Sequence, residues 1–194
     1  MDLLLATRNS HKTRELRELL GDEFSLADLE SSPELKVPPE TGTTFEQNAT
    51  LKAVSVSKTL DGIVIADDSG LEVDALGGAP GIYSARYAGK NAHDAANIDK
   101  LLRELRNVAN RAARFRCAIV IARAEKVLAT VEGTVEGTIV DPPRGVAGFG
   151  YDPVFQPVGF DKTFAEMPPE LKNEISHRAK AVAALRQKLG EISD

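Results

Sequence analysis

The sequence has a single cysteine, no apolar run that approaches the length of a membrane span, and no excess of positive charge. One cysteine, Cys117, excludes a disulfide within the chain and favours a reducing compartment. It lies in the apolar run "RFRCAIVI", where we expect a buried, inert thiol. A membrane-spanning helix needs about 20 apolar residues, and the apolar stretch near the N-terminus is too short for a signal peptide, so we expect a cytoplasmic protein.

The charge balance argues against nucleic acid as a partner. The 194 residues include 24 basic and 29 acidic side chains, which gives a net charge of −5. Binding to nucleic acid without sequence preference needs a basic face, so we expect none. An anionic substrate stays open, because local cations or a divalent metal can hold phosphates on an acidic protein.

The pattern of apolar residues predicts a mixed α/β fold. Hydrophobic residues make up 42% of the chain, and its length fits one domain over residues 1–194. Strands are predicted at 3–6 and 62–66, with the second ending at "DDSG", and two antiparallel strands on either side of Glu125. Helices separate the early strands, which favours parallel pairing there and a mixed sheet covered by helices.

The clearest predicted helix follows Thr43 and Glu46, which have the spacing of a capping box. Its apolar stripe runs from Phe45 to Leu60. A later helix is predicted over about 94–105, and Ser176 is a suitable N-cap for the last helix of the chain.

A polar loop, "TRNSHK" at residues 7–12, joins the first strand to a helix. The free amides and the dipole of a helix N-terminus suit an anion, and Lys12 adds a full charge. The Walker A pattern is absent, and an ordinary helix cap by Asn9 or Ser10 explains the same residues. By itself the loop leaves both interpretations open.

Two adjacent acids, Asp67 and Asp68, follow the strand at 62–66. Neighbouring residues of an extended segment point to opposite faces, so at most one of them need face a cleft directly. Ligands of α/β proteins collect at the carboxyl ends of strands, where an acid can be a metal ligand or a general base. An Asx turn before Gly70 is the alternative.

The C-terminal third adds an aromatic ring and more cations. Phe149 lies between two glycines in "GFGYDP", a position that suits stacking on a base better than core packing, although a ring folded inward is the alternative. His177 and Arg178 fall in the first turn of the last helix, where cations oppose the helix dipole unless a negative ligand binds. Solvated surface charge is the alternative for both. The dispersed cations are Lys12, Lys52, Lys172 and Arg178. Together these features fit a nucleoside polyphosphate with a divalent metal.

Five motifs resemble, in order, those of the inosine/xanthosine triphosphate pyrophosphatases, which act on noncanonical purine nucleoside triphosphates. They are "ATRNSHKTREL", "ETGTTFEQNATLKA", "IADDSGLEVDALGGAPGIYSARYAG", "GFGYDPVF" and "EISHRAKA". The match runs from Leu5 to about Leu185, and the third motif is long and highly specific.

The resemblance implies an elongated mixed β-sheet flanked by helices, with two lobes around a central cleft, and a homodimer. It implies hydrolysis of ITP, dITP and XTP to the monophosphate plus pyrophosphate, with Mg²⁺ as the cofactor. Such an enzyme removes these nucleotides from the cytoplasmic pool.

The resemblance also implies the site residues. Asp68, the second acid of "DDSG", would be the general base, and Glu40 and Asp68 would be the Mg²⁺ ligands. The substrate site would comprise Thr7, Arg8, Asn9, Ser10, His11, Lys12, Lys52, Ser69, Phe149, Gly150, Tyr151, Asp152, Lys172, His177 and Arg178.

The chain departs from the family pattern at four positions. Arg8 stands where glycine is common, Ser10 and His11 stand where smaller residues are frequent, and Gln47 replaces an acid. These departures concern the conformation of the phosphate loop and not the charge chemistry of the reaction.

Other classes of function use similar residues. A phosphatase that forms an aspartyl-phosphate also places an Asp after a buried strand, but it usually needs a D-x-D spacing, which "DDSG" lacks. A non-catalytic nucleotide-binding module is a second alternative. A pyrophosphatase of broader or different nucleotide specificity is a third.

Overall fold

The structure is a computed structural model that describes residues 1–60 and 62–193. The elements follow in the order β1 (Asp2–Leu5), α1 (Ser10–Leu20), β2 (Ser25–Asp28), α2 (Phe45–Ser57), β3 (Ile63–Val73), η1 (Asp74–Leu76), η2 (Gly81–Arg86), α3 (Asp94–Glu104), β4 (Ala112–Arg123), β5 (Lys126–Ile139), η3 (Asp152–Val154), β6 (Phe155–Pro157), η4 (Phe164–Glu166), α4 (Pro169–Ile175) and α5 (His177–Ser193). The chain forms two compact units. Unit 1 comprises Met1–Asp68, Cys117–Gly133 and the segment that begins at Arg178, and unit 2 comprises Ser69–Arg116 and Thr134–His177.

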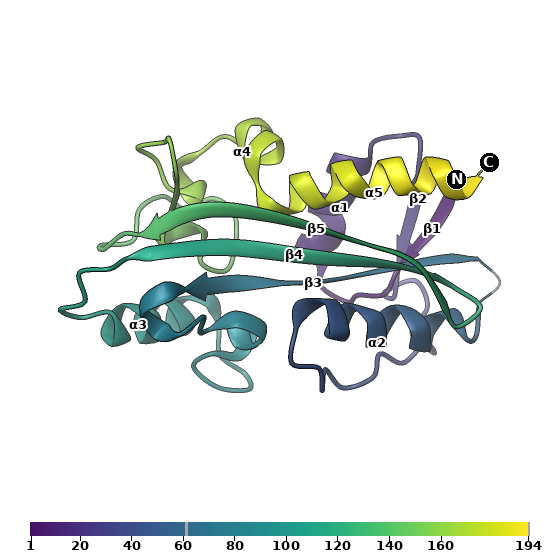
Figure 1. Cartoon of the computed structure of the whole chain (residues 1–194), viewed down its shortest axis with the longest axis horizontal. Helices are drawn as coiled ribbons and strands as arrows, with labels where there is room; N and C mark the ends of the chain where they lie inside the picture. Colours follow the sequence, from purple (N-terminus) through teal and green to yellow (C-terminus); the bar gives the residue numbers. More distant parts are fainter. Residues whose placement is uncertain (61, 194) are drawn as a thin grey trace. The chain divides into compact units, whose positions relative to one another are not determined.

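Six strands form a sheet in the order β2-β1-β3-β4-β5-β6 (Figure 1). β1 pairs in parallel with β2 and β3, whereas β5 pairs antiparallel with β6. Ala124 and Glu125 join β4 to β5, and both have positive φ, as a tight hairpin turn requires. The predicted mixed sheet with flanking helices is therefore confirmed. The short strands β2 and β6 were not predicted.

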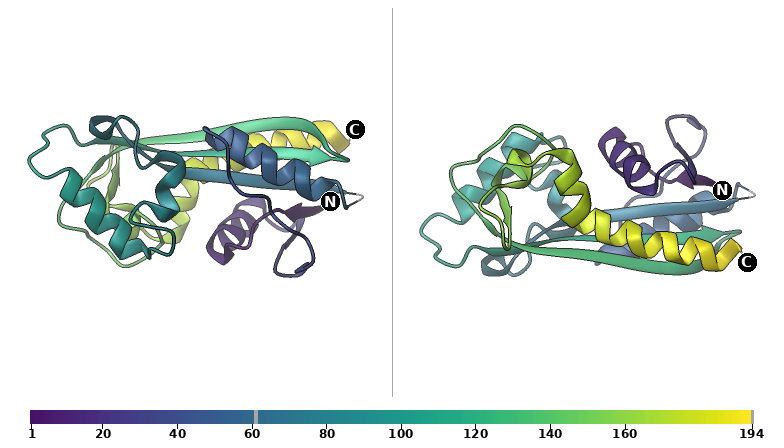
Figure 2. Two further views of the ribbon diagram at one scale, coloured as in Figure 1. Left: turned by 90° about the horizontal axis from the view of Figure 1, so that it is seen from below. Right: turned by 90° about the horizontal axis from the view of Figure 1, so that it is seen from above.

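In unit 1, helices cover both faces of the strands. Side chains of a strand alternate between faces, so Ile63 and Ile65 of β3 pack in a core with α1 and α5, whereas Val64 and Ala66 pack in a separate core with α2. Figure 2 shows α2 in front of the strands from one side and α5 in front of them from the other. This three-layer arrangement decides which helices the next residues of β3 meet.

β3 runs through both acids, so the predicted end of the strand at "DDSG" is wrong, and so is the alternative of an Asx turn. The strand extends from Ile63 to Val73. Asp67 and Asp68 are both buried in it. They stay in the strand because each carboxylate has a cationic partner, Lys12 for the first and Lys52 for the second.

The N-cap of α2 lies one residue later in the chain than the capping box predicted. The N-cap is Thr44, whose hydroxyl accepts from the Gln47 amide at 3.1 Å, in place of the predicted Thr43 and Glu46. The shift follows from the burial of Phe45 as the first helical residue, which leaves Thr43 outside the helix. The Gln47 side chain then accepts from the Thr43 amide at 2.8 Å.

Unit 2 has its own core, which includes the buried face of α3. Three rings form its centre: Phe155 lies 4.6 Å from Phe115 and 5.3 Å from Phe164, measured between ring centroids. Leu101 and Leu105 pack against the same cluster. The predicted helix near 94–105 is therefore confirmed, and its apolar face is the one buried in unit 2.

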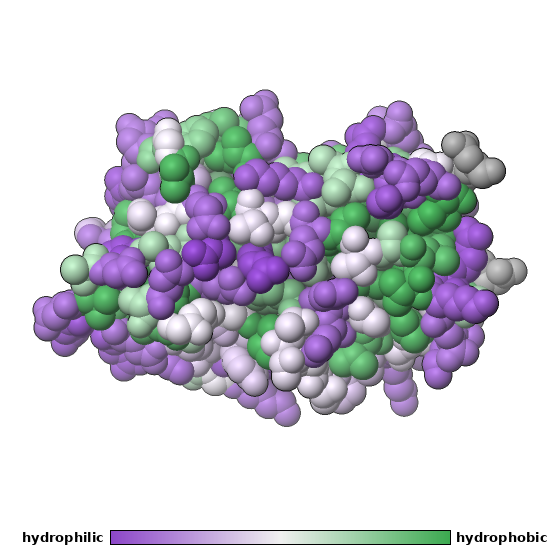
Figure 3. All heavy atoms as spheres, in the orientation of Figure 1, coloured by the Kyte–Doolittle hydropathy of each residue, from purple (hydrophilic) through white to green (hydrophobic). Residues whose placement is uncertain are grey.

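Hydrophilic and hydrophobic residues are interspersed on the face drawn in Figure 3, and the hydrophobic ones gather mainly toward the right of the view. Within residues 1–60 and 62–193, no helix has the length and apolar character that crossing a membrane demands. The two units correspond to the two predicted lobes. The predicted cleft, and the assignment of residues 1–194 to one domain, stay predictions.

Candidate active site

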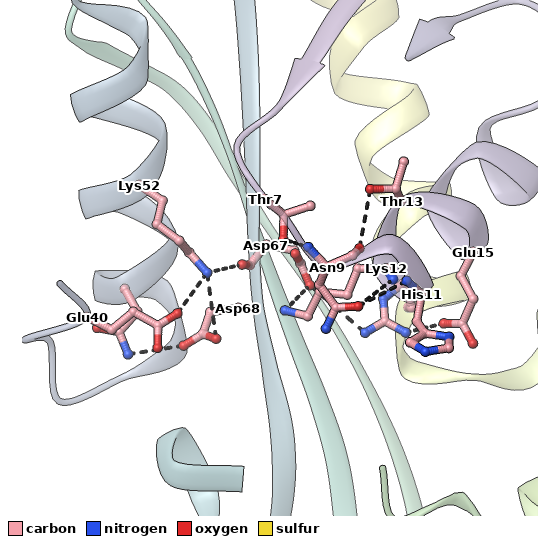
Figure 4. Close-up of polar contacts among 12 residues, drawn as sticks. Thr7, Asn9, His11, Lys12, Thr13, Glu15, Glu40, Lys52, Asp67 and Asp68 are labelled. Atoms are coloured by element: carbon pink, nitrogen blue, oxygen red, sulfur yellow. Dashed lines mark hydrogen bonds and ion pairs between the residues drawn. The ribbon is translucent and has the colours of Figure 1, made fainter. Parts of the chain in front are cut away.

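Asp67 and Asp68 point to opposite faces of β3 and meet different partners (Figure 4). Asp67 lies on the same face of β3 as Ile63 and Ile65, and its partners come from α1 and α5. Asp68 lies on the same face as Val64, and its partners come from α2. Strand geometry therefore separates two adjacent negative charges, which would otherwise repel, into two environments.

The Asp67 side is a buried chain of ion pairs. Lys12 Nζ lies 2.8 Å from Asp67 Oδ2, and Arg178 Nη2 lies 4.0 Å from the same oxygen. Arg178 in turn donates to the carboxylate of Glu15. Burial alone would raise the pKa of Asp67, but Lys12, Arg178 and Lys52 outweigh it and lower that pKa. Asp67 is therefore an ionised anchor for two cations.

The Asp68 side holds a second group, made by α2 and the loop before it. Asn48 Nδ2 donates to Asp68 Oδ2 at 3.1 Å. Lys52 Nζ lies 3.8 Å from Asp68 Oδ1 and 3.2 Å from Glu40 Oε1. Burial raises the pKa of Asp68, and Lys52 and Lys12 only partly oppose this effect. Asp68 thus has the higher proton affinity of the two neighbouring acids.

Glu40 and Asp68 supply the oxygen atoms that a divalent metal would need. Among the described residues, no three His, Cys, Asp or Glu side chains lie close enough together to hold a metal on their own. Two carboxylates do lie against one ammonium group, that of Lys52. Mg²⁺ commonly binds through one or two carboxylates, with water and substrate phosphates completing its coordination. The donor set fits Mg²⁺ in that mode.

The loop at residues 7–12 is capped from within. Asn9 is the N-cap of α1, and its Oδ1 accepts from the amides of His11 at 3.0 Å and Lys12 at 3.3 Å. The backbone N–H of Asn9 donates to the Thr7 hydroxyl at 3.2 Å. The ordinary cap that the sequence left open is therefore present, and phosphate binding by the amides of His11 and Lys12 would have to displace it. Ser10, the first residue of α1, is exposed.

Arg8 binds the backbone of the segment that follows β2. Its guanidinium donates to three backbone carbonyls, those of Leu29 at 2.8 Å, Pro33 at 3.2 Å and Leu35 at 2.9 Å. These bonds tie the loop at 7–12 to the segment that leads toward Glu40. The predicted contact of Arg8 with substrate stays a prediction.

In unit 2, Phe149, Asp152 and Lys172 form a second group. Lys172 Nζ lies 2.6 Å from Asp152 Oδ2 and 5.2 Å from the centroid of the Phe149 ring. The Phe149 amide donates to the same Asp152 oxygen at 3.0 Å. Gly148 is required here, because a Cβ on it would lie 2.0 Å from that oxygen. Asp152 therefore fixes both the ring and the ammonium group.

The remaining predicted residues of unit 2 are Ser69, Gly150, Tyr151 and His177. The Gly150 amide donates to Asp94 at 2.6 Å, and the Tyr151 hydroxyl donates to the Ser84 carbonyl at 2.8 Å, so both have partners within the unit. Ser69 follows Asp68 in β3. His177 begins α5 and stacks on Phe115, with centroids 4.8 Å apart.

One hollow in unit 2 involves none of these residues. It has a volume of about 710 Å³ and is lined by Ala88, Ala96, Asp99, Leu102, Arg103, Arg106, Asn107, Arg111 and Asp141. Charges of both signs line it. The chemistry of the two side-chain groups described above thus lies outside this hollow.

Sequence reasoning missed two residues of unit 1, Glu15 and Asn48. Both are buried polar side chains on helices, at 9% and 0% exposure. Their signal was present: Glu15 lies one turn after Lys12 on α1, and Asn48 lies one turn before Lys52 on the apolar stripe of α2. A polar residue on a buried helix face needs a partner, which indicates a neighbouring site.

The sequence of this chain is similar to those of known proteins. The model of the Ham1 family matches residues 3–188. A protein of Bacillus licheniformis named dITP/XTP pyrophosphatase is 51% identical over 190 residues, which are 95% of this chain and 95% of that protein.

Two solved structures have a closely similar fold. The Ham1 protein of Staphylococcus aureus has a TM-score of 0.89 at 43% identity, and the match covers 98% of this chain and 99% of that one. A HAM1 protein from Coxiella burnetii has a TM-score of 0.90 at 41% identity, with the same coverage. These matches confirm the predicted family and fold class. This chain belongs to the Ham1 family.

Proposed function

We propose that this chain hydrolyses noncanonical purine nucleoside triphosphates, namely ITP, dITP and XTP, to the monophosphate and pyrophosphate, which removes them from the nucleotide pool. Membership of the Ham1 family supports the reaction class. The observation that carries the proposal is the difference between two adjacent acids. Asp67 has a lowered pKa and holds cations, whereas Asp68 has a raised pKa and lies beside Lys52.

The charge of the substrate has to be neutralised locally, because the net charge of −5 repels a polyphosphate. Lys12 and Lys52 are the lysines that unit 1 offers near Asp67 and Asp68. Glu40 and Asp68 would hold Mg²⁺, which when bound screens the phosphates and polarises their oxygen atoms.

Asp68 is the general base in this proposal. It accepts a proton from a water molecule aligned on the α-phosphorus. The water oxygen bonds to that phosphorus, the bond from the phosphorus to the bridging oxygen breaks, and pyrophosphate leaves. A raised pKa makes a carboxylate a stronger base than an exposed one. The rest of the rate enhancement comes from positioning and charge stabilisation, since phosphoryl transfer demands little covalent work from the protein.

The base would be recognised by stacking and by hydrogen-bond donors. Phe149 is the proposed stacking ring, and stacking tolerates any base, so it adds affinity and not discrimination. Inosine and xanthine carry an acceptor oxygen at purine position 6, where adenine carries a donor. Donors from His177, Arg178 or loop amides would pair with that oxygen. Against adenine they would stay buried and unpaired, at a cost of about 1–3 kcal/mol each.

A pyrophosphate-release assay over a nucleotide panel with Mg²⁺ tests the proposal. We expect pyrophosphate and monophosphate from ITP, dITP and XTP, with kcat/KM roughly a hundredfold above that for ATP, the scale of two such unpaired groups. Orthophosphate as the product would support the aspartyl-phosphate mechanism. Binding without turnover would support a non-catalytic module, and equal turnover of ordinary nucleotides would support broader specificity.

We also propose that activity requires Mg²⁺, that the protein is a homodimer and that it works in the cytoplasm, because the family resemblance implies all three. Lys172 and Asp152 in unit 2 are proposed to contact the substrate, and so are Ser69, Gly150 and Tyr151. Light scattering during size-exclusion chromatography measures the mass in solution, and the mass of a single chain would contradict the dimer.

A further inference from the structure

Asn48 is a fully buried amide on the face of α2 that turns toward β3. Its exposed fraction is 0%, and it shares the buried face of the helix with Phe45, Ala49 and Lys52. A buried amide without partners would destabilise the fold by several kcal/mol, on the order of 2–7. The two partners of Asn48 are therefore informative about what it does.

The amide joins the loop that carries Glu40 to the second acid of β3. Asn48 Oδ1 accepts from the Gly42 amide at 2.8 Å, and Asn48 Nδ2 donates to Asp68 Oδ2 at 3.1 Å. The N–H group of Gly42 can only donate, so it must face the oxygen of the Asn48 side chain. The NH₂ end of that side chain therefore faces Asp68. A Cβ on Gly42 would lie 2.7 Å from Asn48 Oδ1, which shows how closely the loop packs on the amide.

Lys52 lies one helical turn further and reaches the same two segments. Its ammonium group contacts Glu40 Oε1 at 3.2 Å and also the backbone carbonyl of Asp67. The two side chains differ in charge, however. Lys52 brings a positive charge that partly cancels those of the carboxylates, whereas Asn48 orients Asp68 with a neutral donor and leaves its negative charge in place.

We propose that Asn48 is a positioning residue, which holds Asp68 and the Glu40 loop in one arrangement before a metal and a substrate bind. The inference rests on the proposed function, in which Glu40 and Asp68 hold Mg²⁺. Hydrogen-bonding partners of metal-binding carboxylates are typically worth about 10–100-fold in metal affinity or activity. Asn48 would belong to this class without touching the substrate.

Two substitutions separate the contact with Asp68 from the contact with the loop. Asn48→Ala removes both hydrogen bonds. Asn48→Asp has nearly the same shape and keeps an acceptor for the Gly42 N–H, but it replaces the donor to Asp68 with a second carboxylate, which repels Asp68 and offers a metal one more oxygen ligand. Gln47→Ala is the matched control, because Gln47 is the neighbour of Asn48 in α2 and also binds the preceding loop. Gln47 Oε1 accepts from the Thr43 backbone N–H at 2.8 Å and from the Thr43 hydroxyl at 3.0 Å.

We expect kcat for pyrophosphate release to fall about 10–100-fold in both Asn48 variants, with a smaller change in KM for the nucleotide. Gln47→Ala should stay within about threefold of the unmodified protein, since it loses only a solvent-exposed cap. Thermal unfolding of every variant accompanies the kinetics. If Asn48→Ala does not fold, the isosteric Asn48→Asp decides.

A second measurement does not depend on turnover. The dissociation constant of Mn²⁺, used alone as a spectroscopic substitute for Mg²⁺, can be measured by electron paramagnetic resonance. It should rise about tenfold in Asn48→Ala and stay unchanged in Gln47→Ala. Unchanged kcat in Asn48→Asp, unchanged Mn²⁺ affinity in Asn48→Ala, or an equal loss in Gln47→Ala would overturn the role of Asn48. Failure of the unmodified chain to release pyrophosphate would instead count against the proposed function, and Mn²⁺ affinity would still decide the role of Asn48.

Discussion

Lys12 and Asp67 form a buried ion pair between α1 and β3. Lys12 Nζ lies 2.8 Å from Asp67 Oδ2, and the side chain of Asp67 is 0% exposed. Burial alone would lower the pKa of Lys12, but Asp67 and Asp68 outweigh it and raise that pKa. The same attraction lowers the pKa of Asp67. Both groups are therefore charged at neutral pH, and neither can be removed without leaving the other unbalanced.

Asp67→Asn should destabilise the protein strongly. It leaves Lys12 and Arg178 facing a neutral amide, and breaking a buried pair in this way costs about 3–5 kcal/mol. Urea unfolding of the two proteins measures the loss. Lys58→Gln is the control, because the Lys58–Glu125 pair also has a 2.8 Å contact but both side chains are 55% exposed, so its loss should cost less than about 1 kcal/mol.

The same substitution should change the acid limb of the stability curve. The pKa of Asp67 is lowered from its ordinary value of 3.8, so its contribution to stability is present above that value. The contribution is lost as pH falls through the lower, folded-state pKa. Asp67→Asn should therefore show less loss of stability below about pH 4. Equal acid sensitivity of the two proteins would argue against an ionised Asp67.

Asp68→Asn should reduce kcat for pyrophosphate release by about a hundredfold or more, the scale for removing a general base. The thermal midpoint at neutral pH should be unchanged or higher. Burial raises the pKa of Asp68, so the folded state disfavours the ionised form above the unfolded-state pKa, and a neutral amide relieves this cost. Turnover within a few-fold of the unmodified rate would show that Asp68 is not the base.

Arg8→Lys and Arg8→Ala should have similar effects. The guanidinium donates to the carbonyls of Leu29, Pro33 and Leu35, and an ammonium group cannot reproduce that planar fork. Each variant should lose about 1–3 kcal/mol of stability, and both should show the same KM for nucleotide. If Arg8 bound phosphate as a simple charge, the lysine variant would keep the unmodified KM while the alanine variant would not.

The thiol of Cys117 should not react in the folded protein. Burial raises the pKa of the thiol to about 12, so the reactive thiolate is scarce at pH 8. The residue is also only 1% exposed, which keeps reagents away from the sulfur. A chromogenic disulfide reagent should label no thiol in the native protein and one in guanidinium chloride. Rapid labelling without denaturant would contradict the burial of β4 at this position.

Much of the fold could be predicted because its signals are local. The stripe of α2 and the hairpin of β4 and β5 follow from periodicity within single segments. The short strands β2 and β6 carry too few residues for a periodic signal, and only their pairing with β1 and β5 makes them strands. The length of β3 was missed for a similar reason: adjacent acids look like a strand end unless their partners are known.

The candidate site was predicted in part. The motifs identified Asp68, Glu40, Lys12 and Lys52 by resemblance. In unit 1 the structure brings Asp68, Glu40 and Lys52 together and pairs Lys12 with the neighbouring Asp67. Asn48 was missed, because its two hydrogen-bond partners lie in other segments of the chain.

The sequence by itself determined that Asp67 and Asp68 would face opposite ways in an extended segment, since successive residues alternate. That β3 continues through both of them was decided by the tertiary structure. Only the tertiary structure decided what each of them meets. α1 and α5 bring Lys12 and Arg178 to one face of β3, and α2 brings Asn48 and Lys52 to the other. The physical reason is that pKa values depend on burial and on charges from distant segments, and no local pattern specifies these before the helices pack on the sheet.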